Sequence, residues 1–217
     1  MIITWYGQSC FKIQSGETVL AVDPFDKSIG LTPPRFRADI LAVTHDHYDH
    51  NNKESINGEP FLICGPGEYE IKGLEILGVE SFHDDSEGAK RGKNTIYKIE
   101  MDEIRICHLG DLGQEKLTDK QLQTLGEIDI LMVPVGGKYT IGAAESIAVI
   151  NQIEPRIVIP MHYKIPGLKI DVAGLSEFLK EFGSKETKPE EKLTLKKKDL
   201  PQEEETKLIV LKLATGQ

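Results

Sequence analysis

The amino-acid sequence predicts a layered α/β fold in which two β-sheets are covered by helices. Short apolar segments bounded by turn residues recur along the whole chain, which indicates many short strands. Helical periodicity is confined mainly to the second half, and strands with interspersed helices favour a layered arrangement. The 217 residues suit one domain, residues 1–217, with a full hydrophobic core, and leave little room for a second.

The expected strands begin with a three-stranded meander that contains a turn at Ser15-Gly16. The strand segments are residues 2–5, 10–14, 18–22, 40–43, 61–64, 74–79, 95–99, 104–107, 128–133, 156–159 and 207–213. Before the last of them, residues 185–205 are dense in Lys and Glu and contain Pro189 and Pro201. Residues 185–217 are therefore expected to form an exposed charged loop or hairpin and a terminal strand.

Three helices are predicted from end signals and apolar spacing. Thr118 and Gln121 form a capping box for the first helix, which should end at Gly126. The second should stop before Pro155, and the third should span residues 171–183. Apolar residues at helical spacing mark one face of each: Ala143, Ile147, Ile150 and Ile153 in the second helix, and Leu175, Phe178, Leu179 and Phe182 in the third.

Composition narrows the expected partners and location. The net charge of −9 disfavours an extended nucleic-acid surface, because such a protein repels phosphate backbones. No segment approaches the ~18 apolar residues of a membrane span, and the N-terminus lacks a signal-peptide pattern. Cys10, Cys64 and Cys107 are odd in number without a CxxC pair, which favours free thiols in the cytoplasm. The expected partner is a small molecule, with an anionic one as an option; a homo-oligomer is left open.

A dense group of metal-ligand residues follows the apolar segment at 40–43. His45, His47, Asp49 and His50 fall within six residues, and imidazole and carboxylate are ligands of zinc and similar divalent metals. In a regular strand Asp49 and His50 would point to opposite faces, and such divergence suits two metals side by side. Histidines rarely cluster in this way without a metal, so the run predicts a metal site.

Further candidates also lie just beyond apolar strand segments, where layered α/β proteins bind ligands. They are Asp23 after 18–22, His83 after 74–79, His108 and Asp111 after 104–107, and His162 after 156–159. Judged singly, each histidine has the alternative of an ordinary loop residue. Asp23 stands before Pro24, so it has the alternative of a turn residue.

The run HDHYDH has the form HxHxDH and, with HLGDLG and PMHY downstream, resembles the signature of the metallo-β-lactamase superfamily. The resemblance extends from Trp5 to about Lys164. It is strongest to the compact branch that includes L-ascorbate-6-phosphate lactonase and small bacterial zinc-dependent hydrolases. The segments that carry this resemblance are GQSCF, VDPF, SFHDD and PVGGKYTIG. The resemblance implies an αββα sandwich with the metals at one edge. It departs from the branch at Gln8, where relatives often carry histidine. The ligand set does not need Gln8, so this departure concerns only contacts behind the ligands or with the substrate.

The resemblance also implies a ligand set for two divalent metal ions, foremost Zn²⁺, with Mn²⁺ or Fe²⁺ as alternatives. The implied ligands are His45, His47 and His83 for one metal, Asp49, His50 and His162 for the other, and Asp111 as a bridge. Asp49 and Asp111 are the implied catalytic carboxylates. Asp23 and His108 are placed behind the ligands, and His83 is preferred to His108 because the branch carries its histidine in an FH segment.

The predicted activity is hydrolysis of a small ester, lactone or phosphoester by hydroxide shared between the metals. Candidate substrate contacts are Lys138, Tyr139 and Thr140 in a glycine-containing loop, and Tyr163 beside His162, with simple packing as the alternative for each.

Other functions are weaker on specific grounds. A nuclease or phosphodiesterase acting on nucleic acid would want a large substrate-binding insertion, and β-lactamases are exported enzymes. A di-metal redox protein on this fold usually carries Glu at the position of His47 and lacks the histidine at His50, and this chain keeps both. A purely structural metal site is closed by four ligands, whereas seven candidates are present here.

Overall fold

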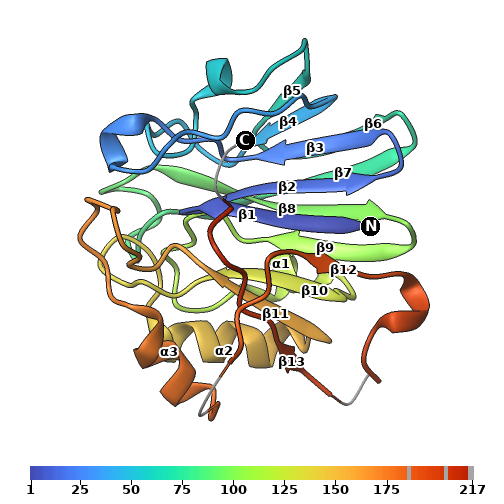
Figure 1. Cartoon of the computed structure of the whole chain (residues 1–217). Helices are drawn as coiled ribbons and strands as arrows, with labels where there is room; N and C mark the ends of the chain where they lie inside the picture. Colours follow the sequence, from blue (N-terminus) through green and yellow to red (C-terminus); the bar gives the residue numbers. More distant parts are fainter. Residues whose placement is uncertain (185–186, 203–204, 215–217) are drawn as a thin grey trace.

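A computed structural model describes residues 1–184, 187–202 and 205–214, and two mixed β-sheets stack face to face in it (Figure 1). The first sheet has the strand order β12-β1-β2-β3-β4-β5 and the second has the order β13-β11-β10-β9-β8-β7-β6. The strands of the first sheet are β1 (Ile2–Gly7), β2 (Cys10–Ser15), β3 (Thr18–Val22), β4 (Ile40–Val43), β5 (Phe61–Cys64) and β12 (Leu193–Thr194). Those of the second are β6 (Gly67–Ile71), β7 (Leu74–Phe82), β8 (Lys93–Met101), β9 (Ile104–His108), β10 (Ile130–Pro134), β11 (Ile157–Met161) and β13 (Lys207–Leu208).

The outer faces of the two sheets are covered differently. Helices α1 (Asp119–Leu125), α2 (Ala143–Ile153) and α3 (Leu175–Glu181) belong to the second sheet's side, where α2 packs on β10 and α3 packs on α2 (Figure 1). Over the first sheet, loops with the short 3₁₀ helices Lys27–Ile29 and Lys53–Ser55 provide the cover. The predicted layered α/β class is confirmed, and one outer layer is built from loops.

Burial explains why β4 reads as a continuous apolar run. Ile40 and Ala42 point into the main core between the sheets, while Leu41 and Val43 join a smaller cluster with Ile56 under the covering loops. A strand buried on both faces has no polar alternation. The same reasoning applies to β10 and β11, whose residues are all buried.

Strand direction brings several loop starts to one edge of the sandwich. β3, β4 and β5 run parallel in the first sheet, and β9, β10 and β11 run parallel in the second. β7 and β9 are both antiparallel to β8, so they also share a direction. The residues that follow β7, β9 and β11 therefore leave the second sheet at the same edge.

Most predicted elements are present, with three differences. β6 is missed from the sequence because its charged residues alternate with few apolar ones, and it is held by pairing with β7. The expected strand at 207–213 is wrong beyond Leu208, since only Leu211 forms a further, isolated bridge. The charged segment before it contains the short β12 and a 3₁₀ helix at Lys197–Asp199, while residues 185–186, 203–204 and 215–217 lie outside the described residues.

All three helices end where predicted, and the third differs from its prediction at its start. The capping box of Thr118 and Gln121 is formed, and α1 ends before Gly126. The third helix begins at Leu175, later than predicted, because residues 171–174 run alongside another segment. There Ala173 donates its backbone N–H to Gly136 and accepts one from Lys164. Among the described residues, no helix has the length and apolar character needed to cross a membrane.

A buried tyrosine joins the two sheets beside the histidine run. The hydroxyl of Tyr97, on β8, donates to the carbonyl of Val43 at 2.9 Å and accepts from the N–H of Gly65 at 2.9 Å. Val43 is the last residue of β4, so this contact fixes the strand end from which the candidate ligands start.

We expect Tyr97→Phe to lower the free energy of unfolding by about 1–3 kcal/mol, because it removes the partner of the buried Val43 carbonyl and of the part-buried Gly65 N–H. Urea denaturation monitored by circular dichroism would measure the change. Tyr69→Phe is the matched control: its hydroxyl also bonds to Gly65, but the residue is only partly buried, so a change within about 0.5 kcal/mol is expected. Equal effects of the two variants would contradict the role given to Tyr97.

Candidate metal centre

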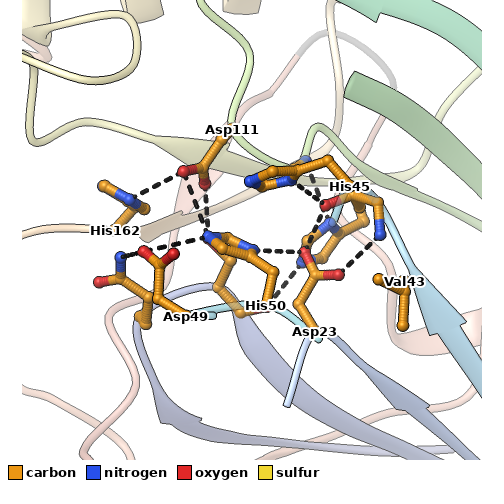
Figure 2. A network of polar contacts seen from close by, with 12 residues as sticks. Asp23, Val43, His45, Asp49, His50, Asp111 and His162 are labelled. Atoms are coloured by element: carbon orange, nitrogen blue, oxygen red, sulfur yellow. Dashed lines mark hydrogen bonds and ion pairs between the residues drawn. The ribbon is translucent and has the colours of Figure 1, made fainter. Parts of the chain in front are cut away.

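Seven candidate ligands from four strand ends meet at one edge of the sandwich, and Figure 2 labels His45, Asp49, His50, Asp111 and His162 among them. The loop after β4 provides four of them, and the ends of β7, β9 and β11 provide one each. Their ligand atoms form two groups: His45, His47 and His83 in one, and Asp49, His50, Asp111 and His162 in the other. Within each group, the ligand atoms lie within 4.8 Å of one another.

Asp111 lies at the centre of the arrangement. Its Oδ2 atom is 3.1 Å from Nε2 of His162, 3.2 Å from Nε2 of His50 and 3.3 Å from Nε2 of His83. Burial alone would raise the pKa of Asp111, but His162 and His50 hold that pKa well below its usual range. The side chain is therefore a carboxylate at neutral pH, the form that can bind a metal ion.

His45 directs an unpartnered nitrogen into the site, and His50 directs one toward Asp111. Nδ1 of His45 lies 2.9 Å from the hydroxyl of Thr44, and Nδ1 of His50 lies 3.0 Å from Oδ2 of Asp23. In the described part of the chain, Nε2 of His45 is buried without a hydrogen-bond partner, and Nε2 of His50 is buried 3.2 Å from Oδ2 of Asp111. Burial lowers the pKa of His45 well below its usual value, which keeps the ring neutral and its nitrogen able to bind a metal. The donor set and these nitrogens fit divalent metal ions.

Asp23 lies behind the ligands, as predicted for it. It is fully buried, and its carboxylate accepts the backbone N–H of Thr44 at 2.8 Å and the hydroxyl of Thr44 at 2.7 Å. The same carboxylate contacts Nδ1 of His50 (Figure 2). Such a contact fixes the ring orientation and increases the basicity of the nitrogen that faces a metal.

His108 lies behind the site, with both ring nitrogens engaged by the backbone. Nε2 lies 2.8 Å from the carbonyl of Ser9, and Nδ1 accepts from the N–H of Gly110 at 3.1 Å. No ring nitrogen is left for a metal. His83, by contrast, directs Nε2 toward Asp111 and belongs to a ligand group, so the geometry favours His83 as the ligand.

Gln8 and Ser9, in the turn between β1 and β2, support the site and are not among the residues predicted to do so. The side-chain amide of Gln8 donates to Oδ2 of Asp49 at 3.0 Å, and the hydroxyl of Ser9 donates to Oδ1 of Asp111 at 3.2 Å. The carbonyl of Gln8 also accepts the N–H of His162 at 3.1 Å. This turn thus holds three ligands. The only signal for it in the sequence is the family motif GQS, because turn residues are polar for many reasons.

A comparison with protein families settles the family of this chain. The model of the beta-lactamase superfamily domain matches residues 2–162. The chain belongs to this superfamily. A UPF0173 metal-dependent hydrolase of Methanocaldococcus jannaschii is 30% identical over 212 residues, which cover 83% of this chain and 91% of the relative. The chain is therefore a metal-dependent hydrolase of the metallo-β-lactamase superfamily, as its motifs predict.

Solved structures agree on the fold of this hydrolase. A protein of Thermotoga maritima, assigned as a Zn-dependent hydrolase of the same superfamily, is 36% identical with a TM-score of 0.78, and the match covers 97% of this chain and 99% of that one. A diiron β-hydroxylase of Streptomyces venezuelae is 13% identical with a TM-score of 0.52, over 74% of this chain and 44% of that one. At this low identity the second likeness concerns the fold alone.

The metal ligands of the hydrolase open into a cleft of about 630 Å³, a volume typical of small-molecule sites. The cleft is lined by the candidate ligands His47, Asp49, His83, Asp111 and His162, together with Tyr48, Arg91, Tyr139 and Lys169. Of the candidate substrate contacts, Tyr139 lies in this cleft. The cleft's size and open form suit a small substrate that contacts the ligands directly.

The other three candidate substrate contacts lie elsewhere. Lys138 forms an ion pair with Asp171, and the hydroxyl of buried Thr140 donates to the carbonyl of Ile141 at 3.1 Å; both line a neighbouring hollow. Tyr163 is in the main core, stacked on Trp5 with ring centroids 5.1 Å apart. Its position next to His162 in the sequence is misleading, because adjacent residues at a strand end point in opposite directions.

We expect Asp23→Asn to weaken metal binding by about 10–100-fold, because the amide no longer fixes the His50 ring. Competition with a chromophoric chelator would measure the affinity. Asp39→Asn is the control, since Asp39 lies before β4, at the other end of the strand that leads to His45, and pairs with Lys72. An unchanged affinity in Asp23→Asn would show that this contact serves folding only.

Proposed function

We propose that this hydrolase holds two divalent metal ions and uses them to hydrolyse a small ester, lactone or phosphoester. The observation that supports two ions is the pair of adjacent ligand groups, each with at least three ligands, on either side of Oδ2 of Asp111. In the proposed site the first group holds one ion, Asp49, His50 and His162 hold the other, and Asp111 contacts both. Zn²⁺ suits nitrogen and carboxylate ligands best, with Mn²⁺ and Fe²⁺ as alternatives.

Metal ions in such a site lower the pKa of a coordinated water to about 7 and stabilise the negative charge that develops in hydrolysis. The side chains then have distinct tasks. Asp49 is buried, which would raise its pKa, but His50 holds that pKa below its usual range. Asp49 is thus a carboxylate at neutral pH that can orient a water molecule and accept its proton. The amide of Gln8 donates to Oδ2 of Asp49 and limits its rotation.

The cleft favours a small substrate over a polymer. It is lined by residues from the loops after β3, β4, β7, β9, β10 and β11, among them the aromatic residues Tyr48 and Tyr139 beside the ligands. The net charge of −9 also opposes an extended nucleic-acid backbone. A phosphodiester remains in the test because a single phosphate group would still fit the metal chemistry.

We also propose a cytoplasmic location. Cys64 is exposed and free, and Cys10 and Cys107 are buried and free. Unpaired thiols, one of them at the surface, suit a reducing compartment better than an oxidising one.

We expect about two metal ions per chain by elemental analysis after loading with zinc, manganese or iron, and turnover of at least one member of a panel. The panel holds a small ester, a lactone, a phosphodiester and a β-lactam. Asp111→Ala should lower turnover by about 100-fold or more, because the ligand shared by both groups is lost. Asp102→Ala is the control: Asp102 lies before β9, at the other end of the strand that leads to Asp111.

One ion or none after loading would contradict the two-metal site. Two ions without turnover of any panel member would rule out the substrate classes proposed here and leave the metal centre in place. Turnover of the β-lactam alone would replace the ester, lactone and phosphoester classes by a β-lactamase activity.

A further inference from the structure

Arg91 is a cationic side chain on the wall of the metal cleft that the metal centre does not use. It belongs to the loop between β7 and β8, and this loop begins with the ligand His83. Lys169 is the other cationic residue that lines the cleft, and it is exposed. A metal centre already attracts anions, so it does not need further positive side chains for its own stability. Their presence in the cleft points to a negatively charged substrate.

The loop that carries Arg91 is fixed by the buried carboxylate of Asp84. Its Oδ1 accepts the backbone N–H groups of Ser86 at 2.8 Å and Gly88 at 3.0 Å, and its Oδ2 accepts those of Lys90 at 2.9 Å and Arg91 at 2.7 Å. The backbone of Arg91 is thereby held to the residue that follows the ligand His83. A position held in this way costs little ordering entropy when a ligand binds.

The guanidinium of Arg91 lies over the ring of Tyr139, 4.7 Å from the ring centroid. Within residues 1–184, 187–202 and 205–214 it forms no ion pair with a carboxylate, whereas Lys90 pairs with Asp85 and Lys93 with Glu80. No carboxylate of the described residues therefore occupies its N–H groups, whose planar fork matches the two oxygens of a carboxylate or phosphate.

Acidic residues in the cleft do not neutralise this cation. Asp171 is paired with Lys138, and Asp46 accepts the side-chain amide of Asn51. Asp49 and Asp111 are engaged with the histidines of the metal centre. Arg91 and Lys169 thus both lack an acidic partner among the described residues, and of the two it is Arg91 whose backbone is held by a buried carboxylate while Lys169 is exposed.

We propose that Arg91, held by Asp84 and stacked on Tyr139, recognises a carboxylate or phosphate group of the substrate. This inference rests on the proposed function, since it concerns a substrate bound in the same cleft, and it narrows the class to small anionic molecules. Arg91 determines specificity by binding the anionic group and takes no part in the proton transfers at the metals.

The test measures anion binding to the metal-loaded protein by calorimetry, which needs no turnover. The probes are inorganic phosphate and succinate, with neutral succinamide as the comparison. Arg91→Ala should weaken binding of phosphate and succinate by roughly tenfold or more, since a hydrogen-bonded charge is lost. Arg91→Lys should give an intermediate loss, because an ammonium keeps the charge without the two-pronged edge. Binding of succinamide should not change.

Lys93→Ala is the matched control, because it removes the same charge only two residues from Arg91. The side chain of Lys93 is paired with Glu80 and does not line the cleft. It should leave anion binding within about twofold, as expected for an exposed charge. Equal losses in Arg91→Ala and Lys93→Ala would reduce the effect to net charge and overturn the proposal. So would unchanged binding in Arg91→Ala, which would show that Arg91 only packs on Tyr139.

This experiment separates the inference from the proposed function. If the substrate panel is not turned over but phosphate binding still depends on Arg91, the hydrolytic proposal fails and the anion site stands. If the panel is turned over and Arg91→Ala does not change anion binding, the hydrolytic proposal stands and the anion site at Arg91 is ruled out. Melting temperatures of all variants, compared with the parent protein, would show that each is folded.

Discussion

The burial of Asp111 is the constraint on which the rest of the structure depends. A carboxylate with almost no exposure is costly unless positive charge and hydrogen bonds compensate for it. Three histidine nitrogens within 3.3 Å and the hydroxyl of Ser9 provide that compensation, and they come from four different segments. The strands must therefore end together at one edge, and the parallel order of β9, β10 and β11 beside the β3–β4 pair achieves this.

The supports behind the ligands are as spread along the chain as the ligands themselves. Asp23 comes from the end of β3, and Gln8 and Ser9 come from the turn after β1. The residues of this turn are 41 and 102 positions from the carboxylates that they contact, which are Asp49 and Asp111. The contact between Ser9 and Asp111 joins the first sheet to the second, so it forms only when the two sheets are packed. Metal affinity and the stacking of the sheets are therefore coupled.

These separations explain what the sequence could predict and what it could not. The segment from His45 to His50 contains several ligand residues close together in the sequence, so its metal-binding role could be predicted without knowledge of the fold. The choice of His83 over His108 depended on a family pattern, and the structure supports it because the backbone occupies both nitrogens of His108. Tyr163 shows the limit: proximity to His162 in sequence says nothing about which side of a strand end faces the cleft. The late start of α3 is a tertiary effect of the same kind, since residues 171–174 pair with distant backbone.

The fold itself does not decide the reaction, because a diiron β-hydroxylase shares it at 13% identity. The reaction depends instead on which side chains lie at the edge of the sandwich where the ligand-bearing loops meet. Here the loop after β4 provides three histidines and one carboxylate, a set that suits hydrolysis, and the neighbouring loops provide the cleft walls. These two parts are joined in the loop between β7 and β8, which contains both the ligand His83 and Arg91. Asp84, the residue after His83, accepts the backbone N–H of Arg91, so the same buried carboxylate ties this part of the cleft wall to the metal centre.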